Sequence, residues 1–183
     1  MSRKRIHPLP SIAELHARFS YDPQTGQLTH RLTHREYAKR GQVAATAQKS
    51  GYIVVATSGN MILAHRVAWA MHHNEWPVGE LDHRDNDKSN NRIDNLRLAT
   101  RAQQRANIPG RAKSGFKGVR AFGHYFRAKI SANNKQYTLG RYDTAEAASI
   151  AYQKAAKTLH GEFANIKNLV RGAINAPIEF KMS

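Results

Sequence analysis

Residues 63–107 read LAHRVAWAMHHNEWPVGELDHRDNDKSNNRIDNLRLATRAQQRAN and join a helical pattern to a polar segment. Val67, Ala68 and Met71 have the spacing of one helix face. After the polar segment, Thr100 is a good N-cap for a second helix that ends near residue 107. We therefore expect two helices with a chemically rich loop region between them.

The polar segment contains an adjacent Asp82-His83 pair. Hydrolysis of a phosphodiester needs a base for the attacking water and a cation beside the phosphate. A carboxylate suits a hard cation and an imidazole suits the water, although such a pair on its own is commonly a surface coincidence. Asn95 follows His83 by twelve residues and precedes Leu-Arg-Leu-Ala-Thr and a polar helix, which favours a catalytic interpretation.

Residues 63–107 resemble the HNH endonucleases of phages and introns, which include homing endonucleases. The resemblance rests on His65-Arg66, Asp82-His83, Asn90-Asn91 and Asn95-Leu96-Arg97. It implies a ββα-metal fold, in which a β-hairpin and a helix hold one divalent ion, usually Mg²⁺, with Mn²⁺ as another candidate. It also implies that His83 is the general base, that Asp82 binds the metal, and that Asn95 braces the loop so that His83 keeps its orientation.

One position departs from that family pattern. The family places Asn or His nine residues after the central Asn, as a second metal ligand, and this chain has Gln104 there. An amide oxygen is still a hard ligand that suits Mg²⁺, but the side chain is one methylene longer. Gln104 is therefore the expected second ligand, with Gln103 or Asn107 as the alternatives if the helix register differs.

The same segment contains two other patterns of possible metal ligands. Asp85, Asp87 and Ser89 occupy alternate positions of a calcium loop, but Asn90 and Leu96 replace its Gly and bidentate Glu, which excludes that site. His72 and His73 are adjacent on a helix and are expected at the surface or facing DNA. The sequence leaves the role of His65 open between a core and a phosphate-contacting residue.

The region before residue 63 has weaker patterns. Residues 11–19 are expected to form a helix with a Ser11–Glu14 capping box and one face made by Ile12, Leu15 and Phe19. Residues 27–32 are a predicted strand, and residues 33–50 show no pattern. Residues 51–57 and 61–64 flank Ser-Gly-Asn and predict a hairpin.

Beyond residue 107 the pattern changes to alternation. Residues 116–122, 125–131 and 136–142 are predicted strands, with Asn133-Asn134 as a turn between the last two. Residues 144–160 are a predicted helix capped by Thr144. Its stripe of small residues would lie against the sheet, and we assign that stripe to Ala147, Ala151, Ala155 and Leu159.

Residues 114–166 resemble the Apetala-two domain of plant ethylene-response factors. The matching features are Lys117-Gly118-Val119-Arg120, the run from Leu139 to Tyr142, the run from Thr144 to Ala148, and Ala151-Tyr152. The resemblance implies a three-stranded sheet that lies in the DNA major groove. The implied contact residues are Lys117, Arg120, Arg127, Lys129, Ser131, Gln136 and Thr138, of which Arg127 and Gln136 can read guanine and adenine edges.

Composition independently favours a polyanionic partner. The 183 residues carry a net charge of +16, with 17 basic and 9 acidic residues in 1–112 and 12 and 4 in 113–183. From Lys113 to Arg141 there are seven basic residues and no acidic ones, whereas a merely solvated face normally mixes both signs. Positive charge over both halves indicates a polyanion, most simply nucleic acid, as the partner, and the two resemblances imply that it is double-stranded DNA. No small-molecule substrate is evident.

Other compositional features exclude several classes of protein. The absence of cysteine excludes disulfides, thiol catalysis and cysteine-zinc sites. The apolar runs are too short to span a membrane, and the basic start leads into no apolar core, so an intracellular protein is expected. In a phage-encoded protein that means the cytoplasm of the bacterial host.

These features together predict an α+β protein with a ββα-metal nuclease and a three-stranded antiparallel sheet packed on one helix. The expected boundaries are a supporting region at 1–50, the nuclease at 51–107, a linker at 108–115, the Apetala-two-like domain at 116–166 and a tail at 167–183. The expected function is Mg²⁺-dependent DNA cleavage, with a nick from each single copy. The alternatives are a catalytically inactive DNA-binding regulator and a phage structural protein that holds DNA.

Overall fold

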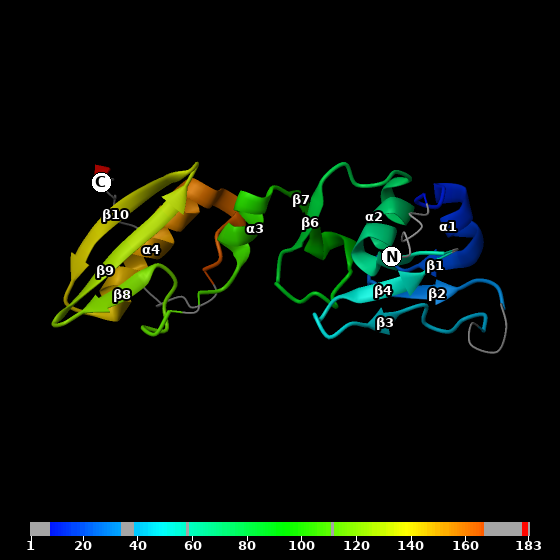
Figure 1. Ribbon diagram of the computed structural model, residues 1–183, viewed down its shortest axis with the longest axis horizontal. Coiled ribbons are helices and arrows are strands. Elements are labelled where there is room, and N and C mark those ends of the chain that lie inside the picture. Colours follow the sequence, from blue (N-terminus) through cyan, green and yellow to red (C-terminus); the bar gives the residue numbers. More distant parts are fainter. Residues whose placement is uncertain (1–7, 34–38, 58, 111, 167–180, 183) are drawn as a thin grey trace, which may run out of the picture. The chain divides into compact units, whose positions relative to one another are not determined.

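A computed structural model describes residues 8–33, 39–57, 59–110, 112–166 and 181–182 (Figure 1). The chain is mixed α/β, with four α-helices among those residues, and so confirms the expected class. It divides into two compact units, residues 1–99 and 100–183. The division falls before the second predicted helix of the nuclease segment, whereas the sequence placed a linker at 108–115.

The first unit begins with the helix α1 (Ile12–Arg18). The predicted capping box is present, because the Ser11 side chain accepts from the Glu14 N–H and the Glu14 carboxylate accepts from the Ser11 N–H at 2.6 Å. Leu15 and Phe19 are fully buried as predicted. The strands that follow are β1 (Phe19–Tyr21) paired with β2 (Leu28–His30), and a sheet of β3 (Thr46–Ala47), β4 (Ile53–Ala56) and β5 (Met61–Leu63).

The helix α2 (Ala64–His73) follows β5 directly and supplies much of the core of this unit. Its buried face packs with residues from α1, from four strands and from the segment before β3: Leu15, Phe19, Leu28, Ala44, Val55, Ile62, Ala64, Val67, Ala70 and Met71. The helix ends where Asn74 adopts the left-handed conformation, with φ of 56°. The last elements are β6 (Glu80–His83), a 3₁₀ turn η1 (Ile93–Asn95) and β7 (Leu96–Ala99), and β6 pairs antiparallel with β7.

The second unit opens with α3 (Arg101–Asn107), capped by Thr100 as predicted. The predicted strands are present as β8 (Val119–Phe122), β9 (Tyr125–Ala132) and β10 (Lys135–Tyr142), and Asn133 and Asn134 make the β9–β10 turn with positive φ. α4 (Ala145–His160) lies along one face of this sheet (Figure 1), followed by a 3₁₀ turn η2 (Gly161–Phe163).

Three expectations need correction. The sheet has a fourth strand, β11 (Lys181–Met182), because a short piece of the predicted tail pairs with β10; the tail residues 167–180 and 183 lie outside the described part. β3 lies in the stretch that showed no pattern, because both of its residues are exposed and give no alternation. In the buried stripe of α4, Ala148 and Tyr152 take the place of Ala147 and Ala151; Ala155 is buried as predicted, Ala156 joins it, and Leu159 packs against the same cluster.

The shift of the α4 stripe has a specific cause. The Tyr152 ring fills the space above Gly118, where an added Cβ would lie 2.1 Å from a ring carbon. Gly118 has φ of +72°, which also favours glycine. The large ring and the missing side chain fit each other, so the face with Tyr152 is buried, and Ala147 and Ala151 remain half-exposed.

Candidate active site and nucleic-acid interface

The β6–β7 hairpin positions the Asp82-His83 pair. The register places Asp82 opposite Arg97 and His83 opposite Leu96. Both side chains are buried, with 9% of Asp82 and 5% of His83 exposed. The two residues make different contacts: the carboxylate meets β7, and the imidazole meets the loop and α2.

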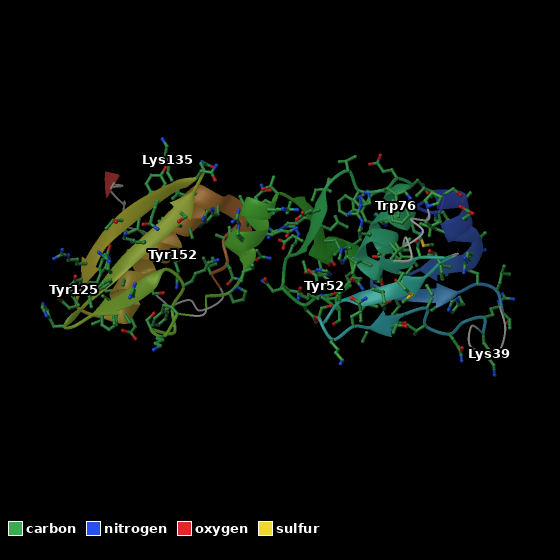
Figure 2. All side chains as sticks on the ribbon, viewed as in Figure 1. Lys39, Tyr52, Trp76, Tyr125, Lys135 and Tyr152 are labelled. Atoms are coloured by element: carbon green, nitrogen blue, oxygen red, sulfur yellow. The ribbon has the colours of Figure 1, made fainter. Side chains whose placement is uncertain are left out.

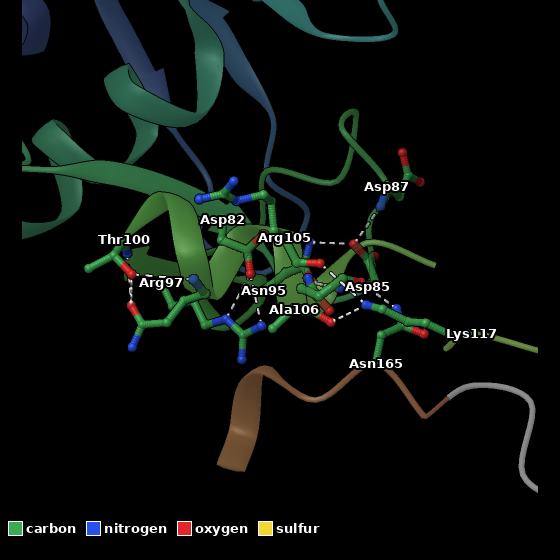
Figure 3. Close-up of polar contacts among 12 residues, drawn as sticks. Asp82, Asp85, Asp87, Asn95, Arg97, Thr100, Arg105, Ala106, Lys117 and Asn165 are labelled. Atoms are coloured by element: carbon green, nitrogen blue, oxygen red, sulfur yellow. Dashed lines mark hydrogen bonds and ion pairs between the residues drawn. The ribbon is translucent and has the colours of Figure 1, made fainter. Parts of the chain in front are cut away.

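Asp82 forms a buried ion pair that the sequence analysis did not anticipate. Its Oδ2 accepts hydrogen bonds from Nε of Arg97 at 2.9 Å and from Nη2 at 2.8 Å (Figure 3). The two side chains are 10% and 6% exposed. A metal ion on Asp82 would therefore share the carboxylate with a guanidinium. The sequence could have indicated this ion pair only through the register of the β6–β7 hairpin, which places Arg97 opposite Asp82, and the sequence analysis did not predict that register.

His83 is oriented by a buried amide and lies beside two rings. Its Nε2 is 3.1 Å from Oδ1 of Asn91, which is itself buried. The His65 ring meets the His83 ring edge-on with centroids 5.0 Å apart, and the Tyr52 ring lies 6.2 Å away. Burial, with the charges of His83 and Arg66, lowers the pKa of His65 to about 3. His65 is therefore neutral at physiological pH and belongs to the buried cluster.

Asn95 makes three hydrogen bonds to the loop that follows His83. Its Nδ2 donates to Oδ1 of Asp85 at 2.9 Å and to the Asn90 carbonyl at 2.8 Å, and its Oδ1 accepts from the Asp85 N–H at 3.1 Å (Figure 3). Asn90 also donates to Asp85, at 2.7 Å. Burial acts to raise the pKa of Asp85, but these hydrogen bonds and the charge of His83 lower it on balance.

The brace reaches His83 through Asn91. The Asn91 carbonyl accepts from the Tyr21 hydroxyl at 2.9 Å, so the residue is held from the β1 side as well. Gly26 packs against the same backbone, where an added Cβ would lie 2.7 Å from the Asn91 carbonyl carbon. The loop between β6 and η1 is therefore fixed at Asp85 by Asn95 and at Asn91 by the N-terminal strands.

Gln104 is half-exposed on α3, in the second compact unit. Of its two alternatives, Gln103 is committed to the capping box, because its Oε1 accepts from the Thr100 N–H at 2.8 Å and hydroxyl at 3.0 Å. Asn107 is 3% exposed. The cap contact disfavours Gln103, and Gln104 as a ligand paired with Asp82 on one metal ion stays a prediction, with Asn107 as the alternative. No cluster of three His, Cys, Asp or Glu side chains suited to a metal occurs within the described part of the chain.

Comparison with known proteins gives the same assignment to this segment. Residues 63–106 match the HNH endonuclease family. The matched segment contains Asp82, His83, Asn95 and Gln104, and it ends before the C-terminal sheet.

One relative extends the similarity beyond the HNH segment. An Acanthamoeba polyphaga mimivirus protein named as an uncharacterized HNH endonuclease is 34% identical over 118 residues, which cover 63% of this chain and 62% of the viral protein. No solved structure matches the chain. The HNH match and this relative support a nuclease enzyme, as the sequence predicted, and neither assigns the C-terminal sheet to the Apetala-two family.

Outside the HNH segment, the exposed face of the C-terminal sheet carries a row of three arginines. Arg120 lies opposite Arg127, and Arg127 lies opposite Arg141, on three adjacent strands. Like charges directly opposite each other destabilise a sheet. Two aromatic rings reduce that cost: Arg127 lies 4.1 Å and Arg120 5.2 Å from the Phe122 ring centroid, and Arg141 lies 5.0 Å from that of Tyr125.

The remaining predicted contact residues continue the same face in two further rows. Lys129 lies opposite Thr138 and donates from Nζ to Oε1 of Gln136 at 3.0 Å, and Ser131 lies opposite Gln136. The Phe122 and Tyr125 rings are stacked at one end of this face; Tyr125 is labelled in Figure 2. Lys117 is the exception among the predicted residues, since its ammonium group contacts carbonyls of the α3 region instead.

Sequence reasoning missed Arg141 on this face. The strict alternation of β10 places residue 141 on the side of Tyr137 and Leu139. The structure has a register shift between Thr138 and Gly140, so Arg141 pairs with Arg127 on the outer face. Gly140 was the available signal, because an isolated glycine within a strand often marks a bulge.

The described residues contain no helix long and apolar enough to cross a membrane.

Proposed function

We propose that this protein is a metal-dependent DNA endonuclease of the HNH homing type. The observation that carries the proposal is the hairpin in which Asp82, His83 and the loop braced by Asn95 are held together, within the segment that matches the HNH family. The net charge of +16 and the arginine row on the sheet support DNA as the substrate.

His83 is the proposed general base. Asn91 holds the ring at Nε2, and the neutral His65 packs against the ring without placing a positive charge beside it. A fixed imidazole can take the proton of a water that attacks the phosphorus, a contribution of about 10²–10⁴-fold in rate. Asn95 acts on His83 through the loop, because it holds the Asn90 carbonyl next to Asn91, and Asn91 contacts the His83 ring.

Asp82 and Gln104 are the proposed residues for a divalent cation, Mg²⁺ or Mn²⁺. A carboxylate and an amide oxygen are hard donors that suit Mg²⁺, which commonly binds one or two carboxylates together with substrate phosphates and water. When bound, such an ion stabilises the charge on the phosphate and on the leaving oxygen. Arg97 holds the Asp82 carboxylate through hydrogen bonds to Oδ2, and its positive charge offsets the negative charge of that carboxylate.

The C-terminal sheet is the proposed recognition surface for the duplex. Arg120, Arg127 and Arg141 present guanidinium groups in one row, and guanidinium groups suit both phosphates and guanine edges. Lys129, Ser131, Gln136 and Thr138 extend the surface along the strands. One catalytic segment in each chain favours a nick in one strand, and a double-strand break would need a second copy.

The test is incubation of the purified protein with supercoiled plasmid in Mg²⁺, in Mn²⁺ and in chelator. We expect open-circular DNA with either ion and intact supercoiled DNA in chelator. The His83→Ala variant is the matched control for a contaminating nuclease. DNA binding without cleavage in both ions would refute the proposal and favour a catalytically inactive regulator. The strongest argument for that alternative is the buried Asp82–Arg97 pair, because it already occupies the carboxylate.

A further inference from the structure

Lys117 caps the C-terminal end of α3. Its Nζ donates to the carbonyl oxygens of Ala106 and Ile108, both at 2.6 Å, and of Arg105 at 3.3 Å (Figure 3). The last carbonyls of a helix have no partner within the helix, and a cation there is favourable. An ammonium group has three N–H donors, and three carbonyls take them, so Lys117 has none left for a DNA phosphate.

Asn165, which follows η2 much later in the sequence, also bonds to carbonyls at the end of α3. Its Nδ2 donates to the Asn107 carbonyl at 2.5 Å, and its backbone N–H donates to the Ala106 carbonyl at 3.4 Å. Lys117 and Asn165 together thus satisfy four consecutive carbonyls, from Arg105 to Ile108. We name these two residues the α3 clasp.

The stretch predicted as a linker is folded back onto the clasp. Gly110 lies so close to Lys117 that an added Cβ would be 2.5 Å from its Cα. Next to Lys117, the Gly118 carbonyl accepts from the Lys129 N–H at 2.9 Å, which ties the clasp into β9. Asn165 follows η2, directly after the helix α4 that packs on the same sheet. α3 is therefore attached to both layers of the C-terminal unit.

We propose that the α3 clasp fixes the helix that carries Gln104 to the DNA-binding sheet, so that it sets the distance between the recognised sequence and the cut. This inference rests on the proposed function. Lys117 and Asn165 are then positioning residues: they act through the orientation of α3 and contact neither DNA nor metal. α3 and the proposed recognition sheet belong to the same compact unit.

The first test needs no nuclease activity. Lys117→Met removes the ammonium group and keeps most of the stem, and Asn165→Ala breaks the clasp without changing the charge. Both variants should increase hydrogen exchange of the α3 amides at residues 104–108 by about 10-fold or more, since the hydrogen bonds that hold the carbonyls at the end of α3 are lost. Lys157→Met, an exposed lysine on α4, is the control for charge and should exchange like the wild type.

The second test maps cut positions on plasmid DNA by sequencing the product ends. The wild type should cut at preferred positions, and both clasp variants should keep cutting but scatter the cuts over neighbouring positions, while Lys157→Met keeps the wild-type positions. A wild type that cuts without preferred positions overturns the link between recognition and cleavage. A wild type that does not cut refutes the proposed function alone, because hydrogen exchange still decides whether the clasp exists.

A phosphate-contacting role for Lys117 gives the opposite pattern. Lys117→Met would then weaken DNA binding and reduce the salt dependence by about 0.9 in slope, the value for one phosphate contact. Asn165→Ala would leave DNA binding, α3 exchange and cut positions unchanged. That combination overturns the clasp.

Discussion

Replacement of Asn95 tests how the loop after His83 is held. The Asn95 side chain is 8% exposed and makes three hydrogen bonds, of which one goes to the Asp85 carboxylate. Hydrogen bonds contribute about 1 kcal/mol each when neutral and about 1.5–3 kcal/mol when one partner is charged. Asn95→Ala should therefore lower the free energy of unfolding of the first unit by about 3.5–5 kcal/mol.

Asn95→Asp gives a sharper result because of its pH dependence. The new carboxylate would face Oδ1 of Asp85 where the amide nitrogen now lies at 2.9 Å. Two facing carboxylates raise the folded-state pKa of the pair above the unfolded value. The variant is then stable below the unfolded pKa and loses stability as pH rises through the folded pKa. We expect Asn95→Asp to be less stable than Asn95→Ala at pH 7, with the difference shrinking toward pH 4.

Urea unfolding followed by tryptophan fluorescence measures this directly, because both tryptophans, Trp69 and Trp76, lie in the first unit. Ser89→Ala is the control within the same loop, since its exposed hydroxyl bonds to the exposed Asp87 and its loss should cost less than about 0.5 kcal/mol. The reasoning fails if Asn95→Ala unfolds like Ser89→Ala, or if Asn95→Asp is the more stable Asn95 variant at pH 7.

Three further predictions follow from the site and the sheet. Gln104→Ala should raise the Mg²⁺ concentration for half-maximal cleavage and Gln104→Asn should not, whereas a raised requirement only in a residue 103 or 107 variant would exclude Gln104 as the ligand. Arg141→Gln should reduce the salt slope of DNA binding by about 0.9, and an unchanged slope would remove Arg141 from the interface. Because hydrogen bonds lower the pKa of Asp85, its contribution to stability is lost as pH falls through that pKa; Asp85→Asn should therefore flatten the acid side of the stability profile in urea titrations, and an unchanged acid side would contradict this.

Local patterns in the sequence predicted most of the elements. Ser11 with Glu14, and Thr100 before α3, are cap signals that depend on residues within one turn, and the structure has both caps. The Asn133-Asn134 turn is equally local, since asparagine tolerates the positive φ that a tight hairpin needs. The strand β9 was predicted from the strict alternation of apolar and polar residues, because side chains along a strand point to opposite faces in turn.

The features that the sequence did not reveal depend on contacts between distant residues. Arg97 meets Asp82 only through the β6–β7 register. The sequence pattern predicted Lys117 to be an exposed basic residue. Its contact with the carbonyls of residues 105, 106 and 108 depends on how α3 packs within the C-terminal unit. The α4 stripe was assigned from small residues alone, whereas the fit of the Tyr152 ring over Gly118 selects the neighbouring stripe.

The assignment of His83 as general base is tested most directly by single-turnover cleavage with saturating protein and Mg²⁺, comparing the wild type with His83→Ala. The account predicts a loss of at least about 10²-fold in rate with DNA affinity nearly unchanged, because His83 is buried and acts on the attacking water. A variant that cleaves at the wild-type rate would contradict it.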